Sequence, residues 1–109
     1  MGTHIDRPLV SVIMPAYNAE KYIAEAISSV LSQSYTNWQL LILDDCSTDH
    51  TAEIAEDFEK ADTRIRVLRN PRNMGVAKTR NRGMDMAKGE WVALLDSDDR
   101  WHDDKLEKQ

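Results

Sequence analysis

Residues 91–99 are Trp91-Val92-Ala93-Leu94-Leu95-Asp96-Ser97-Asp98-Asp99, an apolar run followed by three carboxylates within four residues. The apolar part predicts a buried strand. Three acids at the tip of a buried strand repel one another, so folding alone gives no reason to place them together. Mg²⁺ and Mn²⁺ relieve such repulsion because they prefer oxygen ligands, and Mg²⁺ is usually held by one or two carboxylates plus substrate phosphates. The segment therefore favours metal-dependent chemistry on a phosphate ester, with a solvated acidic loop as the alternative.

The length and composition indicate one small globular domain. The 109 residues are enough for one domain with a modest core and too few for two. The 41% hydrophobic and 30% charged residues are typical of a soluble protein, and no apolar run approaches the roughly 20 residues of a membrane span. Residues 1–7 are expected to be a tag remnant or a disordered start, which places the domain at residues 8–109. The single cysteine, Cys46, excludes an internal disulfide and fits a reducing cytoplasm.

Charges are distributed unevenly along the chain. The formal net charge of −5 argues against a general nucleic-acid binder. Residues 44–59 contain seven acids and no bases, whereas residues 64–88 contain eight bases and one acid. Some of these bases suit solvated helix and loop positions, and a few are expected to face an anionic ligand.

Strands and helices are predicted to alternate. Apolar and β-branched runs predict strands over residues 9–14, 38–43 and 64–68, and a fourth strand from Trp91. Helices are predicted between them, the first with an apolar face made of Tyr22, Ile23, Ala26, Ile27, Val30 and Leu31. The predicted helix caps are Asn18, Ser47 or Thr48, and Gly89, and a further short helix is expected near Asp103.

This alternation predicts an α/β fold with a mostly parallel sheet and right-handed crossovers. In such sheets ligands bind beyond the carboxyl ends of the strands. Three polar motifs fall at those ends, at residues 15–18, 44–45 and 96–99. Their convergence on one rim is stronger evidence for a binding site than any one of them, and it weakens the solvated-loop alternative.

The residue types at this rim suit a nucleotide ligand. Tyr17 offers an aromatic face for stacking a base, and Asp45 can accept a hydrogen bond from a base N–H. Arg80 can bind a diphosphate. Each residue also has an ordinary structural explanation: a packing tyrosine, a turn or capping aspartate, and an arginine on a helix surface.

The motifs of this chain resemble those of the family 2 glycosyltransferases, which have the GT-A fold. The resemblance covers nearly all of residues 8–109, with every motif in the family's order and spacing, at residues 10–18, 41–49, 73–75, 78–83, 89–92 and 95–99. It implies a nucleotide-sugar-binding half of a GT-A (Rossmann-like) domain. It also implies transfer of a sugar from a nucleotide-diphosphate donor, such as a UDP-sugar, to a glycan or lipid acceptor, as in polysaccharide biosynthesis.

The resemblance also assigns residues to the donor site. Those implied in nucleotide-sugar binding are Pro15, Ala16, Tyr17, Glu20, Asp45, Arg80, Asp96 and Ser97. Within this set, Asp45 is implied to contact the base and Asp96 the ribose or sugar. Asp98 is implied to bind Mn²⁺ or Mg²⁺ that bridges the diphosphate, with Asp99 as a less certain neighbour. Cys46 replaces a glycine common in the family, which is tolerated if its φ is negative.

The family pattern extends further along the chain than this sequence does. Inversion at the anomeric carbon needs a base to deprotonate the acceptor hydroxyl, and in the family this carboxylate lies well beyond the Asp-X-Asp motif. We therefore expect a fold truncated after that motif, with the acceptor half absent and the catalytic base beyond Gln109. Such a chain is expected to bind donor only and to self-associate through uncovered apolar surface. The expected location is the cytoplasm, including the inner face of the membrane through peripheral association.

Other classes of protein fit less well. A phosphoacceptor domain places its acid pair after the first strand, whereas the pair here follows the second. No Gly-X-Gly-X-X-Gly or P-loop sequence is present. An aspartate-nucleophile phosphatase carries Asp-Ser-Asp on its first strand. A non-catalytic nucleotide-binding module remains the open alternative.

Overall fold

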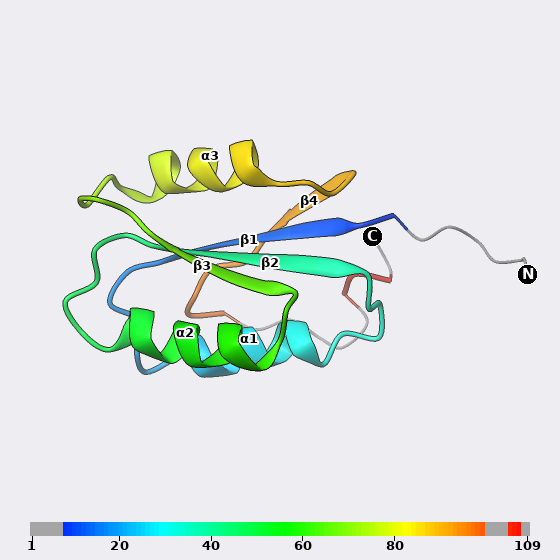
Figure 1. Ribbon diagram of the computed structural model, residues 1–109, viewed down its shortest axis with the longest axis horizontal. Coiled ribbons are helices and arrows are strands. Elements are labelled where there is room, and N and C mark those ends of the chain that lie inside the picture. The colour runs from blue at the N-terminus through cyan, green and yellow to red at the C-terminus, as the bar shows by residue number, and fades with distance from the viewer. Residues whose placement is uncertain (1–7, 100–104, 108–109) are drawn as a thin grey trace, which may run out of the picture.

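The computed structural model describes residues 8–99 and 105–107 and confirms the predicted alternation of strands and helices. In chain order the elements are β1 (Val10–Ala16), α1 (Ile23–Leu31), β2 (Trp38–Asp44), α2 (Thr51–Ala61), β3 (Ile65–Arg69), α3 (Val76–Met86) and β4 (Trp91–Leu94) (Figure 1). The short helix expected near Asp103 falls on residues outside the described part of the chain.

The four strands form one parallel sheet in the order β3-β2-β1-β4. Helices α1 and α2 cover one face, and α3 lies on the other (Figure 1). The chain moves from β1 outward through β2 to β3 and then returns to place β4 on the opposite side of β1. The order therefore reverses between β1 and β4, and this reversal is the point at which open α/β sheets bind their ligands.

The core consists of two apolar layers separated by the sheet. The central strand β1 is buried along its whole length and β2 along nearly all of it, as expected for strands covered on both faces. The thicker layer lies under α1 and α2, and a thinner one made of Ile13, Leu41 and Leu43 lies under α3. Helix α3 approaches the sheet at Gly83, where an added Cβ would lie 2.5 Å from a methyl of Ile13.

The prediction of a buried fourth strand is wrong. Trp91, Val92 and Leu94 are 64%, 46% and 48% exposed, and only Ala93 and Leu95 are buried. The reason is position, because β4 is an edge strand that pairs with β1 alone in the described part of the chain. An apolar sequence cannot reveal which strand lies at the edge. Self-association remains a prediction, and this exposed edge is the surface to which it refers.

Gly89 does not cap α3, contrary to the prediction. The helix ends at Met86 and is followed by Ala87 in extended conformation. Gly89 instead allows a close approach of two backbone segments, because an added Cβ would lie 2.5 Å from the carbonyl oxygen of Leu9. Its N–H donates to the Ser11 hydroxyl at 2.8 Å, which sets the entry into β4. None of the helices in residues 8–99 is long and apolar enough to cross a membrane.

Candidate functional site

A cavity of about 590 Å³ lies at the carboxyl ends of the strands. This volume is within the range of small-molecule sites. The lining residues come from the end of β1, from the loops after all four strands and from the first half of α3: Pro15, Ala16, Tyr17, Asn18, Ala19, Tyr22, Asp45, Asn73, Gly75, Val76, Thr79, Arg80, Asp96, Ser97 and Asp98. The structure therefore brings the three polar motifs of the sequence to one cavity.

All of the predicted site residues except Glu20 and Asp99 line this cavity, and Asp99 lines the small neighbouring hollow that also contains Asp98. The Glu20 carboxylate lies 3.1 Å from Nδ1 of His50, on the outer side of the loops after β1 and β2. Both side chains are exposed, and the carboxylate raises the pKa of His50 by accepting its hydrogen bond and by charge attraction. Whether Glu20 contacts a ligand stays a prediction.

The loop after β1 is joined to the loop after β2 by hydrogen bonds. Asn18, predicted as a helix cap, instead accepts the N–H of Thr48 at 2.8 Å, and its own N–H donates to the Ser47 hydroxyl at 2.9 Å. Helix α1 begins after Tyr22 and α2 after His50, each without a side-chain cap, so the predictions of Ser47 or Thr48 as caps are also wrong. The two loops thus hold the half-exposed ring of Tyr17 at the cavity wall.

The Asp45 side chain is the most enclosed carboxylate of the cavity, with 5% of the residue exposed. It accepts hydrogen bonds from the Asn70 amide at 2.9 Å and from the N–H groups of Met74 and Gly75 at 2.7 and 2.9 Å. Burial alone raises the pKa of this carboxyl, but the hydrogen bonds from these donors outweigh it and hold the pKa below its usual value. Asp45 is therefore ionised and acts only as an acceptor near neutral pH.

Arg80 and Asp96 form an ion pair across the cavity, with 2.9 Å between guanidinium and carboxylate. The arginine comes from α3 and the aspartate from the loop after β4. The buried Nε of Arg80 has no hydrogen-bond partner in the described part of the chain. Because a guanidinium has five N–H donors, Arg80 can bind a further anion while it keeps Asp96.

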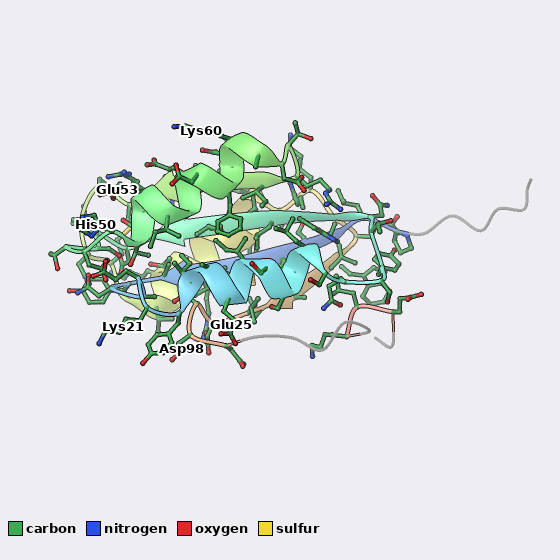
Figure 2. The ribbon with its side chains drawn as sticks, turned by 90° about the horizontal axis from the view of Figure 1, so that it is seen from below. Lys21, Glu25, His50, Glu53, Lys60 and Asp98 are labelled. Atoms are coloured by element: carbon green, nitrogen blue, oxygen red, sulfur yellow. The ribbon has the colours of Figure 1, made fainter. Side chains whose placement is uncertain are left out.

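Asp96 and Asp98 are the carboxylates that could hold a metal ion. Figure 2 shows Asp98 near the first turn of α1, where it shares a small hollow with Glu25. Within residues 8–99 and 105–107, no group of three or more His, Cys, Asp or Glu side chains could hold a metal ion. The side chains therefore suit a cation of the Mg²⁺ or Mn²⁺ type that is held by one or two carboxylates and completed by ligand phosphates.

Several lining residues were not identified from the sequence. Tyr22 was assigned to a buried helical face, but it is 55% exposed because it precedes the first residue of α1. Val76 and Thr79 also line the cavity. Nothing in the local sequence distinguishes Thr79 from other helix residues. Its hydrogen bonds with Asn70 and Gly75, in the loop between β3 and α3, exist only in the folded chain.

Cys46 differs from the expectation of a negative φ. Its φ is +61°, in the left-handed region that L-residues adopt at a cost. Its thiol donates to the carbonyl of Asn70 at 3.3 Å, and Asn70 in turn binds Asp45. The residue thus joins the loop after β2 to the loop before α3.

Comparison with known proteins shows the family of this chain. Residues 11–109 match the sequence profile of the family described as Glycosyl transferase family 2. The chain belongs to this family. It is 49% identical over 105 residues to the Escherichia coli protein UDP-Glc:alpha-D-GlcNAc-diphosphoundecaprenol beta-1,3-glucosyltransferase WfgD. The match covers 96% of this chain and 41% of that protein, so the chain spans about two fifths of the length of this curated relative.

Solved structures of the same kind share the fold. The S. aureus protein TarS, residues 1–349 in complex with UDP-GlcNAc, superposes with a TM-score of 0.85 and 37% identity over 91% of this chain and 29% of that one. Mannosyltransferase PcManGT from Pyrobaculum calidifontis, in complex with GDP-Man and Mn²⁺, gives a TM-score of 0.81 and 27% identity over 88% and 29%. The sheet and helices of this chain are therefore the N-terminal portion of a GT-A glycosyltransferase fold.

Proposed function

We propose that this chain forms the donor site of a glycosyltransferase that moves a sugar from a nucleoside diphosphate to a glycan or lipid acceptor. One observation supports it above the others: an aromatic ring, a buried acceptor carboxylate, an arginine and two further carboxylates line one cavity at the carboxyl ends of the strands. Together they match the parts of a nucleotide-sugar, which are a base, a diphosphate and a sugar. The family relationship supports the same assignment.

The nucleoside binds at the β1 and β2 side of the cavity. Tyr17 is 51% exposed and can stack against a base. The carboxylate of Asp45 accepts a base N–H, and the backbone of Pro15 and Ala16 forms the adjoining wall. Uracil is the proposed base because it has such an N–H, and TarS has been solved with UDP-GlcNAc.

The diphosphate and sugar bind at the β4 side. Asp98 would hold Mn²⁺ or Mg²⁺ together with the diphosphate oxygens, and Asp96 would contact the ribose or sugar. Arg80 would bind the phosphates through the donors that its ion pair with Asp96 leaves free. When bound, the metal acts as a Lewis acid that stabilises the negative charge of the departing nucleoside diphosphate. PcManGT has been solved with Mn²⁺ and GDP-Man, which supports the metal. Ser97 lies between the two aspartates and faces the same cavity.

Transfer with inversion needs a base for the acceptor hydroxyl, and none of the described residues is assigned this role. We propose that the base and the acceptor site belong to the part of the longer relatives that these 109 residues do not cover. The chain alone would then bind donor without transferring sugar, in the cytoplasm or at the inner face of the membrane.

Calorimetric titration of UDP and GDP, with and without Mn²⁺, tests this proposal. We expect metal-dependent binding by the wild type and loss of the metal dependence in Asp98→Asn, which keeps the side-chain shape and removes its charge. Asp85→Asn is the matched control, because Asp85 is exposed on α3 and does not line the cavity.

Two results would contradict the proposal. Failure of the wild type to bind either nucleotide would refute a donor site in this chain. Equal affinity with and without Mn²⁺ would refute the metal at Asp98 while leaving the nucleotide site intact.

A further inference from the structure

A buried polar cluster lies directly behind the cavity wall at Asp45. Its central residue, Asn70, follows β3 and is 4% exposed, and Thr79 on α3 is fully buried. The side-chain amide of Asn70 donates both to the Asp45 carboxylate and to the Thr79 hydroxyl, each at 2.9 Å. Asn70 is not among the residues that line the cavity. Any effect of Asn70 on a ligand must therefore pass through the cavity residues that it bonds, Asp45 and Thr79.

The Asn70 side chain is itself held from both sides. Its carbonyl oxygen accepts a guanidinium N–H of Arg82 at 2.5 Å, which fixes the amide with its NH₂ group toward Asp45. The Thr79 hydroxyl accepts from that NH₂ group and donates to the Gly75 carbonyl at 2.7 Å. Asn70 therefore has one orientation that satisfies all of these partners.

The consequence is a nearly saturated carboxylate. An ionised carboxylate has about four acceptor positions on two oxygens. Oδ1 of Asp45 accepts from the Asn70 amide and the Met74 N–H, and Oδ2 accepts from the Gly75 N–H. One position is left, on Oδ2, and Asp45 belongs to the cavity wall. A ligand can meet this position only with a hydrogen-bond donor.

We propose that Asn70 is a positioning residue that fixes Asp45 with this single free acceptor and thereby selects nucleobases that present a ring N–H. The inference rests on the proposed function. Uracil and guanine have such an N–H, whereas cytosine and adenine have an unprotonated nitrogen at the corresponding ring position, which the carboxylate repels. Asn70 thus acts on base selectivity through Asp45, without touching the base itself.

The variant Asn70→Asp tests this because it replaces only the NH₂ group by an oxygen. That oxygen would face Oδ1 of Asp45 at hydrogen-bond distance, and two carboxylates so placed share one proton. Among the described residues, Arg82 and the thiol of Cys46 are the other titratable groups that face Asn70. Arg82 lowers the shared pKa but does not separate the two oxygens.

The expected result is a new pH dependence of nucleotide binding. While the two carboxylates share a proton, Asp45 keeps its position and UDP binds. As the pH rises through the shared pKa, that proton is lost, and repulsion between the two negative charges displaces Asp45. At pH 8 we expect Asn70→Asp to bind UDP at least about tenfold more weakly than the wild type, and at pH 5.5 within about threefold. The preference for UDP over CDP, and for GDP over ADP, falls in parallel. Asn81→Asp, an exposed site on α3, is the matched control and should follow the wild-type profile.

The outcomes separate the two proposals. If the wild type binds neither UDP nor GDP, the donor site and this inference both fail. If the wild type binds but Asn70→Asp has the same pH profile and base preference, the inference alone is overturned. If circular dichroism shows that Asn70→Asp is unfolded, the variant Thr79→Val decides. Because Thr79 itself lines the cavity, the readout is base preference: we expect a smaller preference for UDP over CDP, which Thr79→Ser restores. A wild-type base preference in Thr79→Val would overturn the inference.

Discussion

Replacing Asp45 by asparagine should lower the stability of the fold as well as remove a ligand contact. The carboxylate accepts three hydrogen bonds, from the Asn70 amide and from the N–H groups of Met74 and Gly75. The asparagine side chain has one oxygen and one NH₂ group. In either orientation of the asparagine, its NH₂ group faces at least one of these N–H donors. At least one hydrogen bond is therefore lost, and two donor groups then point at each other.

The size of the effect follows from the burial of the site. A hydrogen bond to a charged group contributes about 1.5–3 kcal/mol, and a buried donor left without an acceptor costs about 1–3 kcal/mol. With 5% of the residue exposed, water cannot replace the lost acceptor. We expect Asp45→Asn to lower the free energy of unfolding by about 3 kcal/mol, a large part of the roughly 5–15 kcal/mol typical of a domain.

Urea unfolding followed by far-UV circular dichroism measures this difference. Because the donors hold the pKa of Asp45 below its usual value, the stabilisation is present above about pH 4 and is lost as the pH falls through the folded-state pKa. The difference between wild type and variant should therefore be full at pH 7 and smaller at pH 3. The exposed control Asp85→Asn should stay within about 0.5 kcal/mol of the wild type.

A destabilisation below about 1 kcal/mol at pH 7 would contradict the proposed role of the three hydrogen bonds to Asp45. A difference in stability that does not shrink in acid would contradict it as well. The first result would mean that the three donors find other acceptors, and the second that the charge of Asp45 does not contribute.

Three further predictions concern the strand entry, the cavity and its rim. Gly89→Ala should lower the free energy of unfolding measured in urea by about 1–3 kcal/mol, because the added Cβ would lie 2.5 Å from the carbonyl oxygen of Leu9. Wild-type stability would contradict this, because it would mean that the two backbone segments move apart without cost. Arg80→Gln should change the free energy of unfolding by less than about 1 kcal/mol, since the ion pair between Arg80 and Asp96 is partly exposed. The same variant should bind UDP more weakly in calorimetry, and an unchanged affinity would mean that Arg80 does not contact the nucleotide. Glu20→Gln should lower the pKa of His50 in an NMR titration, because the Glu20 carboxylate stabilises the protonated imidazole. This ion pair exists below the pKa of His50 and is lost as the pH rises through it. An unchanged pKa in the variant would contradict the contact.

The order of elements and the position of the site were predictable because both depend on local sequence. Runs of apolar residues specify strands, three- and four-residue spacing specifies helices, and their alternation leaves a parallel sheet as the simplest arrangement. Since parallel strands end on the same edge, the polar groups at residues 15–18, 44–45 and 96–99 had to meet there. The structure confirms this edge as the location of the cavity.

The helix caps and the exposure of β4 were not predictable in the same way. Asn18 has the chemistry of a cap, but its side chain binds Thr48, which is 30 residues away in the chain. Trp91 is apolar, yet it is 64% exposed because β4 lies at the edge of the sheet. Both outcomes depend on which segments become neighbours, and local sequence contains no record of that.

The sequence alone therefore determined the α/β class, the parallel sheet, the edge at which a ligand binds and the acids at that edge. The spacing of apolar residues and the common direction of the parallel strands decide these features. Tertiary structure decided which partners those acids have. Asp45 is fixed by donors 25 to 30 residues away, and Asp96 is held by an arginine 16 residues before it on another element. A carboxylate's charge state and free acceptor positions depend on the donors that packing brings to it, so only the folded chain specifies them.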